Sequence, residues 1–289
     1  MPVAFGISTV SGISADRLNT LLYRPQKGAC RTVVLFPGDI SQLFRPSETQ
    51  VPYRYSIEAL AWLMASRFPS ENIVVVVPCE MKAGYAEYKN FIPILDRLGN
   101  PHWGLGNKAK VPLHQPIQHL EGLLKRLCQD GDSLSEELSL VFFSKGATVA
   151  NALFLDNLRP LFWSQVRSVD IVDPGLSIPG ELFPLNMVDL TRLAKAVRND
   201  FSLRLHLTPR QYCDRNRPWI RQEIDTFVQI GRNISFPIHR TVYFSDIPSP
   251  VAQEDLLDMH FDSLCVLGSG EQPMDDAVKM AQGFFSRWK

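Results

Sequence analysis

Three observations predict an α/β fold with a mostly parallel central sheet and helices on both of its faces. Short apolar runs alternate with segments of helical periodicity along most of the 289 residues. The runs at 31–37, 72–78 and 138–143 are continuous and rich in β-branched residues, as in strands buried on both faces. Alternation of strands and helices is typical of right-handed βαβ units, which build parallel sheets.

The expected elements follow in chain order. Segments 3–10 and 17–24 are predicted to form an antiparallel pair at one edge of the sheet. Further strands are expected at 31–37, 72–78, 138–143, 166–172, 202–207 and 237–244, and helices at 55–68, 116–128, 147–158 and 218–230. The last of these helices has Pro218 in its first turn and Gly231 just past its end, a common pair of start and stop signals.

Two stretches rich in glycine and proline, at 82–113 and 174–190, interrupt this alternation. We interpret them as lid-like excursions between elements of the sheet. The sequence has no internal repeat, low-complexity segment or charge run that would divide the chain. It therefore predicts a single α/β domain over residues 1–289.

The composition narrows the class of protein. Hydrophobic residues make up 45% of the chain, a composition typical of globular proteins. Lys+Arg and Asp+Glu each number 30, and this balance of charge argues against a nucleic-acid partner. No apolar run is long enough to span a membrane. The N-terminus resembles neither a secretory signal nor a transit peptide, and the five cysteines are scattered without a CxxC pair. We therefore expect an intracellular, cytoplasmic protein in a reducing compartment.

The segment LSLVFFSKGATVANALFL, residues 138–155, carries the strongest functional signal. An apolar strand ends in Ser144-Lys145-Gly146 and a helix begins at once, so Ser144 is predicted to be a nucleophile on a strand-to-helix elbow. The alternative is that Ser144 only caps the helix. Phe142 stands where such elbows commonly have glycine, and we expect it to crowd the helix.

Other residues complete a predicted catalytic site. Gly38, Asp39 and Ile40 follow an earlier strand, where a loop can supply an oxyanion donor together with the backbone N–H of Lys145. His260 is the histidine that follows the last strand, although a surface role is the alternative. The predicted acid is Asp214, which follows the strand at 202–207, and the alternative acid is Asp173, which follows the strand at 166–172.

No metal or cofactor is expected. His114 and His119 are five residues apart, which suits no shared helix face. The segment GLGNKAK at 104–110 follows no strand and lacks the spacing of a phosphate-binding loop, and no GxGxxG follows the first strand of the parallel set.

The segments VVLFPGD, FSKG and HLTPRQYCDRNRPWIRQEIDTFVQIG, followed by a late histidine, resemble an uncharacterised family of α/β-hydrolase-like proteins. Its human member is a mitochondrial protein encoded by an open reading frame on chromosome 2. The resemblance runs from about residue 19 to 260, and it implies Ser144 as nucleophile, Asp214 as acid and His260 as base. Family members tend to have glycine at the position of Phe142 and Asp-Gly-Gly at residues 173–175. They also tend to carry a targeting extension, so a mitochondrial location rests on the resemblance alone.

The sequence thus predicts a serine hydrolase that acts on an ester, thioester or similar acyl group. Aromatic residues in the first excursion suit a small, lipid-like acyl substrate: Tyr85, Tyr88, Phe91 and Trp103. Lys145 is expected to pair with Asp39, because an unpaired ammonium group beside the nucleophile is costly to desolvate. The alternative is a hydrolase fold without turnover that serves as a binding or scaffold protein, which Phe142 and Lys145 motivate.

Overall fold

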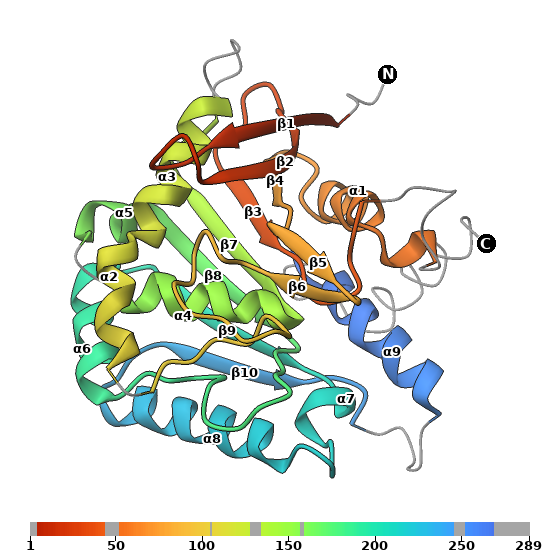
Figure 1. Ribbon diagram of the computed structural model, residues 1–289, viewed down its shortest axis with the longest axis vertical. Helices are drawn as coiled ribbons and strands as arrows, with labels where there is room; N and C mark the ends of the chain where they lie inside the picture. The colour runs from red at the N-terminus through yellow and green to blue at the C-terminus, as the bar shows by residue number, and fades with distance from the viewer. Residues whose placement is uncertain are drawn as a thin grey trace.

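The central element is an eight-stranded sheet with the order β1-β2-β4-β3-β7-β8-β9-β10 (Figure 1). The computed structural model describes residues 5–43, 52–104, 106–127, 134–156, 159–245 and 252–268. The strands are β1 (Gly6–Ser11), β2 (Leu18–Arg24), β3 (Thr32–Phe36), β4 (Asn72–Val76), β7 (Leu138–Phe143), β8 (Val166–Val172), β9 (Ser202–Leu207) and β10 (Ile238–Val242). β2 pairs antiparallel with β1 and β4, and the pairs from β4 to β10 are parallel.

This arrangement confirms the predicted fold class and the antiparallel edge pair. Each expected strand is present within a few residues of its expected bounds, although positions 3 and 4 of the first lie outside the described residues. β3, β4 and β7 are buried along their whole length, as their continuous apolar runs predict. Alternate side chains of these strands enter two separate cores, one on each face of the sheet.

Helices cover both faces, as Figure 1 shows. One core receives α3 (Pro116–Leu127), α4 (Ala147–Leu155), α5 (Pro160–Gln165), α6 (Met187–Ala196) and α8 (Pro218–Asn233). The other receives α1 (Ile57–Arg67) and α9 (Gln253–Asp262). α4 is buried at every residue, because it lies on the sheet and is itself covered by other helices. The four expected helices correspond to α1, α3, α4 and α8, and residues 128, 157 and 158 of the expected ranges lie outside the described residues.

Both excursions contain regular structure that the sequence did not predict. The first contributes the hairpin β5 (Glu80–Lys82) and β6 (Tyr85–Glu87) and the short helix α2 (Val111–His114), and the second leads into α6. α6 begins with a capping box between Asn186 and Asp189. The two excursions contact each other, since Glu181 accepts hydrogen bonds from both N–H groups of Trp103, at 2.7 and 3.0 Å.

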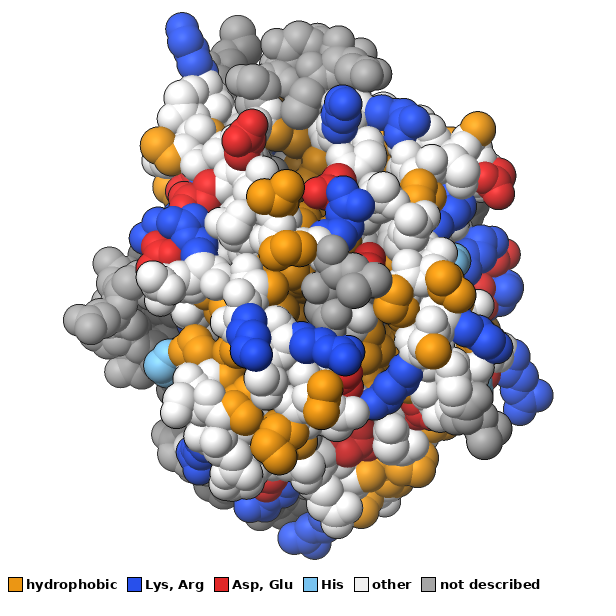
Figure 2. All heavy atoms as spheres, turned by 90° about the vertical axis from the view of Figure 1, so that its left-hand side faces the viewer, with side chains coloured by type: hydrophobic (Ala, Val, Ile, Leu, Met, Phe, Trp, Pro, Cys, Tyr) orange, Lys and Arg blue, Asp and Glu red, His pale blue; other side chains and the backbone are white. Residues whose placement is uncertain are grey.

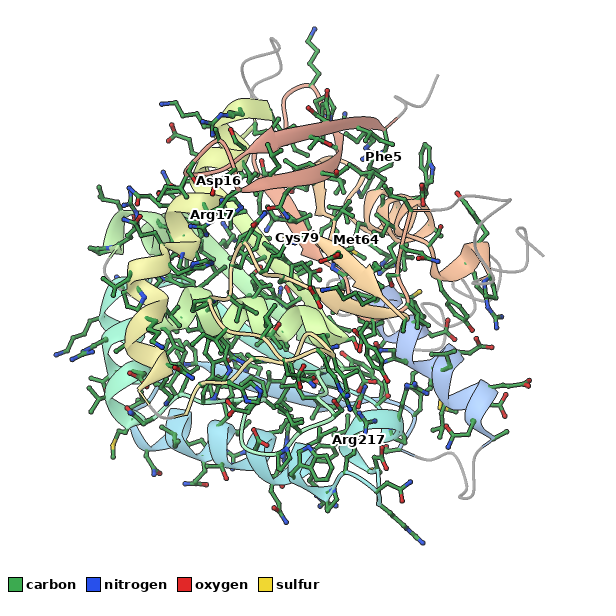
Figure 3. All side chains as sticks on the ribbon, in the orientation of Figure 1. Phe5, Asp16, Arg17, Met64, Cys79 and Arg217 are labelled. Atoms are coloured by element: carbon green, nitrogen blue, oxygen red, sulfur yellow. The ribbon has the colours of Figure 1, made fainter. Side chains whose placement is uncertain are left out.

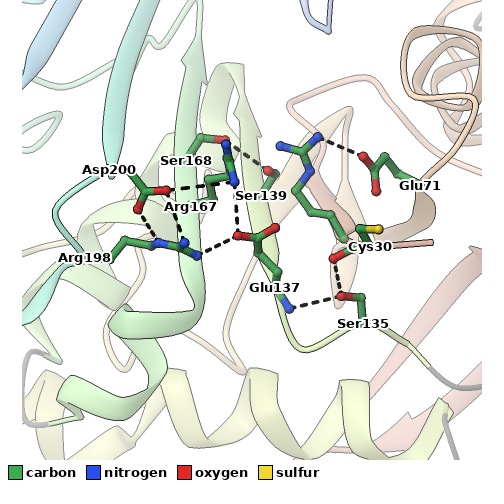
Figure 4. Close-up of polar contacts among 10 residues, drawn as sticks. Cys30, Glu71, Ser135, Glu137, Ser139, Arg167, Ser168, Arg198 and Asp200 are labelled. Atoms are coloured by element: carbon green, nitrogen blue, oxygen red, sulfur yellow. Dashed lines mark hydrogen bonds and ion pairs between the residues drawn. The ribbon is translucent and has the colours of Figure 1, made fainter. Parts of the chain in front are cut away.

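Charged and hydroxyl side chains hold the amino ends of the strands (Figure 4). Arg198, near the start of β9, donates to Glu137, before β7, at 2.6 Å, and Ser168 of β8 donates to Ser139 of β7 at 3.1 Å. Ion pairs this exposed contribute about 0–1 kcal/mol each, so their main effect is to order this edge. The opposite edge, with the carboxyl ends of the strands, is the one where parallel sheets bind ligands.

The surface over α2, α5 and α6 carries hydrophobic side chains interspersed with lysine and arginine (Figure 2). The large hydrophobic side chains exposed on these three helices are Leu113, Leu161, Met187 and Val188. None of the helices that the structure describes is long and apolar enough to cross a membrane.

Candidate active site at the carboxyl edge of the sheet

Ser144 lies on a strained turn between β7 and α4. Its φ angle is 53°, in the left-handed region that a residue with a side chain rarely adopts, as expected for an elbow nucleophile. Gly146 makes the turn possible, because a Cβ atom there would lie 2.2 Å from the carbonyl oxygen of Phe36. No side chain caps the 3-10 turn at Ser144–Gly146 or α4 itself. The alternative in which Ser144 is only a helix cap is therefore wrong.

Gly38, after β3, lies directly against the elbow. A Cβ atom on residue 38 would be 2.3 Å from Cβ of Ser144 and 2.9 Å from its Oγ. A contact this close excludes any side chain, so a glycine is required at position 38. The loop after β3 is thus brought to the predicted nucleophile, where the sequence analysis expected it.

Phe142 does not crowd the helix in the way the sequence suggested. Its ring is fully buried and stacks on Phe36 of the neighbouring strand, with centroids 5.1 Å apart and an interplanar angle of 15°. The two strands place these residues side by side in register. The elbow therefore accommodates a large residue where glycine is common, because Phe36 provides an aromatic partner.

Asp173, and not Asp214, contacts the histidine. Nδ1 of His260 donates to Oδ2 of Asp173 at 2.6 Å, and both side chains are buried. The backbone N–H and the hydroxyl of Thr208 donate to the two oxygens of Asp173, each at 2.7 Å. Bonds of this kind are short and directional, so they fix the position of the carboxylate. The prediction that Asp214 contacts His260 is wrong.

The sheet order explains the correction. β8 lies next to β7, so the residue that ends β8 emerges beside the elbow, whereas Asp214 follows the more distant β9 and the short helix α7 (Pro209–Tyr212). Asp214 instead holds its own loop, because it pairs with Nε of Arg217 at 2.8 Å and accepts a bond from the N–H of Asn216 at 2.8 Å. Arg217 lies beside α7 in Figure 3, well away from Arg17 in the β1–β2 connection.

His260 lies in the last turn of α9. Its ring packs against Phe143, the residue before Ser144, with centroids 4.5 Å apart. α9 is fixed to the core by Asp258, which accepts a hydrogen bond from the hydroxyl of Tyr55 at 2.5 Å and pairs with Arg54 at 2.9 Å. The alternative that His260 is a surface residue is wrong, since 5% of it is exposed.

Lys145 pairs with Asp39, as predicted. Nζ of Lys145 lies 2.9 Å from Oδ1 of Asp39 and donates to the carbonyl of Leu98 at 2.7 Å, and it lies 4.8 Å from the centre of the Tyr85 ring. The same Asp39 oxygen accepts the backbone N–H of Ala86 at 2.8 Å. These contacts join the elbow, the loop after β3 and the first excursion into one structure.

The structure also narrows the choice of backbone donors for an oxyanion. The N–H of Ile40 donates to the carbonyl of Gly84 at 2.7 Å, so it is occupied. The N–H of Asp39 has no backbone acceptor among the described residues, and the N–H of Lys145 lies in the first turn after β7, where helical N–H groups lack intrahelical acceptors. These two groups remain as candidates, one at the elbow and one in the loop after β3.

Positive φ angles gather at this site. Ile40, Ser144 and Asp173 follow β3, β7 and β8, and their φ values are 59°, 53° and 42°. Each such residue costs of order 1–3 kcal/mol and persists only where the surrounding structure imposes it. The strain thus marks the three strand ends that meet at the carboxyl edge.

A cavity of about 270 Å³ opens above Ser144 and His260. Its lining is mostly polar: Asp39, Ile40, Tyr85, Ser144, Lys145, Gly175, Leu176, Ser177, Arg210, Gln211, Arg217, Leu257 and His260. Of the aromatic residues expected to line an apolar pocket, Tyr85 does so. Tyr88, Phe91 and Trp103 are instead buried in the main core, so that part of the expectation is wrong. Both excursions contribute walls of the cavity.

Three contributors to the site were missed in the sequence analysis. Thr208 stands before a proline, a pattern that signals a helix start, but nothing in the pattern indicates its bonds to Asp173. The contacts of Leu98 and Phe143 depend on tertiary packing alone. No group of three or more metal-ligating side chains occurs among the residues that the structure describes.

The order of the strands, the strained turn at Ser144 and the helices on both faces of the sheet define a protein of the α/β-hydrolase fold. Among solved structures, the esterase Est22 has a TM-score of 0.50 at 10% identity over 98% of this chain and 81% of its own. An esterase of the fungus Rhizomucor miehei has a TM-score of 0.47 at 11% identity over 99% and 85%. The esterase Pf2001 of Pyrococcus furiosus has 0.44 at 12% over 82% and 81%.

Residues 6–135 and 128–237 match the family model described as C2orf69, and the chain belongs to this family. No curated protein matches the sequence. The likeness to solved esterases concerns the fold, because the identities are low.

Proposed function

We propose that the protein is a serine hydrolase that cleaves an acyl group from an ester or thioester. The observation that carries the proposal is the 2.6 Å bond between His260 and Asp173, together with Ser144 on the wall of the same cavity. Because Nδ1 of His260 donates to the carboxylate, the neutral ring keeps a lone pair on Nε2, which a general base requires.

The reaction follows from these groups. Oγ of Ser144 attacks the acyl carbon while Nε2 of His260 takes its proton, and the same proton passes to the departing alcohol or thiol. Water then attacks the acyl-enzyme, again with His260 as base, and releases the carboxylic acid and Ser144. The N–H groups of Lys145 and Asp39 meet the negative oxygen of each tetrahedral intermediate, where one donor contributes about 3–4 kcal/mol.

A fluorophosphonate probe, which forms a bond to activated serines, tests the proposal. We expect the probe to label the wild type and Ser144→Ala to lose labelling. Ser177→Ala is the matched control, because Ser177 lines the same cavity but has no role in the proposed mechanism. A wild type that stays unlabelled and hydrolyses no 4-nitrophenyl ester would overturn the proposal and favour a binding protein on a hydrolase fold.

A further inference from the structure

Arg210 is a cation in the cavity that has no carboxylate partner among the described residues. The other two cationic side chains of the lining are paired, Lys145 with Asp39 at 2.9 Å and Arg217 with Asp214 at 2.8 Å. Nε of Arg210 is buried and has no hydrogen-bond acceptor in the part of the chain that the structure describes. Arginine stays charged in proteins, so this charge calls for an anion.

The two carboxylates that act electrostatically on Arg210, Asp173 and Asp214, already bind other groups. Both oxygens of Asp173 accept bonds from Thr208, and one of them also accepts from His260. Asp214 is held by Arg217 and the N–H of Asn216. Burial lowers the pKa of the Arg210 guanidinium, although Asp173 partly opposes this effect. The protein thus pays a desolvation cost at Arg210 without an internal ion pair to offset it.

The position of Arg210 relative to the proposed catalytic groups is fixed by Thr208. The Thr208 hydroxyl binds Asp173 and also accepts the backbone N–H of Arg210 at 3.3 Å, where α7 begins. Gln211, the next residue, packs on Gly175, and its Oε1 is buried without a donor among the described residues. Arg210 therefore lies in the first turn of α7, and Thr208 connects this turn to the Asp173–His260 pair.

We propose that Arg210 binds a carboxylate carried on the acyl chain of the substrate, so that the enzyme prefers half-esters of short dicarboxylic acids. The planar guanidinium fork matches a carboxylate with two parallel hydrogen bonds, which an apolar acyl chain cannot use. The polar lining and the 270 Å³ volume suit a short anionic chain better than a long lipid tail. This inference rests on the proposed function.

Two 4-nitrophenyl esters of similar length test the inference: the anionic half-ester of glutaric acid and the neutral ester of pentanoic acid. We expect the wild type to favour the glutarate ester in kcat/KM. Arg210→Gln should lower the ratio of the two kcat/KM values by about tenfold to a hundredfold, the range for a hydrogen-bonded charge pair. Arg215→Gln is the matched control, because Arg215 is exposed and does not line the cavity, and it should leave the ratio unchanged.

A binding measurement separates this inference from the proposed function. Calorimetric titration of glutarate into Ser144→Ala should show binding that weakens at least tenfold when Arg210→Gln is added. Hydrolysis of both esters with no preference for glutarate, or with a preference that survives Arg210→Gln, would overturn the inference and leave the hydrolase standing. If neither ester is cleaved, binding of glutarate that depends on Arg210 supports the anion site alone, and binding that does not depend on it overturns that site.

Discussion

Asp173 Oδ2 lies 2.6 Å from Nδ1 of His260, and the carboxyl group is fully buried at the end of β8. The residue after β8 thus orients the proposed base, and β8 lies next to β7, the strand that leads to Ser144. Asp214, which the sequence favoured for this role, is bound to Arg217 in the connection between α7 and α8.

Asp173→Asn should lower kcat for a 4-nitrophenyl ester by about 10³–10⁴-fold, because an amide in this place no longer favours the required histidine tautomer. Asp214→Asn should change kcat less than threefold, since it weakens one partly exposed ion pair and leaves the contact between Asp173 and His260 in place. Both substitutions keep the side-chain volume, so a comparison of the two rates measures the role of each carboxylate. Equal effects of the two variants would contradict the assignment.

Lys145→Met should lower the rate of ester hydrolysis about tenfold and the free energy of unfolding by about 1–3 kcal/mol. The substitution leaves Asp39 bound to Ala86 but removes its cationic partner, and it frees the carbonyl of Leu98. The loop that carries the second proposed oxyanion donor then loses its tie to the elbow. Urea unfolding and ester hydrolysis measure the two effects.

Lys110→Met serves as the control for Lys145→Met, because Lys110 is exposed on the first excursion and does not line the cavity. Asp39→Asn should lower activity in the same way as Lys145→Met, since it weakens the same pair. Unchanged hydrolysis in both single variants, with full loss in Ser144→Ala, would show that the pair does not support the site.

The elements were predictable because their signals are local. β3, β4 and β7 have unbroken apolar runs, and α8 begins with Pro218, so periodicity and start signals locate them without knowledge of the fold. Ser144 and Gly38 were predictable for a similar reason, since Ser144 directly follows β7 and Gly38 comes two residues after the end of β3.

The partner of His260 was not predictable in this way. The choice between Asp173 and Asp214 depends on which strand lies beside β7, and strand order is a long-range property that periodicity does not encode. The role that we propose for Arg210 is hidden for the same reason, because a lone arginine between Pro209 and Gln211 has no local pattern. Tyr88, Phe91 and Trp103 were misassigned to the cavity, since composition does not tell a pocket wall from a core.

Asp262→Asn should stabilise the protein above pH 6. Burial, with a smaller contribution from the nearby Asp258, raises the pKa of Asp262 from 3.8 to about 6 in the folded protein. Between these values the folded state keeps a proton that the unfolded state releases, so the stability of the wild type falls as pH rises through this window. The variant lacks this titration, and its advantage should grow from near zero at pH 4 to about 1–2 kcal/mol at pH 7.

The control for Asp262→Asn is Asp255→Asn, on the exposed start of the same helix, where the difference from wild type should not grow between pH 4 and pH 7. Urea unfolding at a series of pH values gives both differences. An advantage of Asp262→Asn that is the same at pH 4 and pH 7 would mean that the folded protein does not hold this proton.

Gly38→Ala should abolish most activity while the sheet remains folded. The added Cβ would meet Cβ of Ser144 at 2.3 Å, so the loop after β3 and the elbow must move apart by a distance comparable to a bond length. A misplacement of about 1 Å near the reacting atoms can lower a rate by about 10²-fold, and we expect a loss of that size in kcat. Gly104→Ala is the matched control, because a Cβ there meets no atom within 4 Å. Circular dichroism of both variants checks the fold. If Gly38→Ala keeps wild-type rates, the loop does not approach the reacting carbonyl, and the oxyanion donor has to be sought elsewhere than at Asp39.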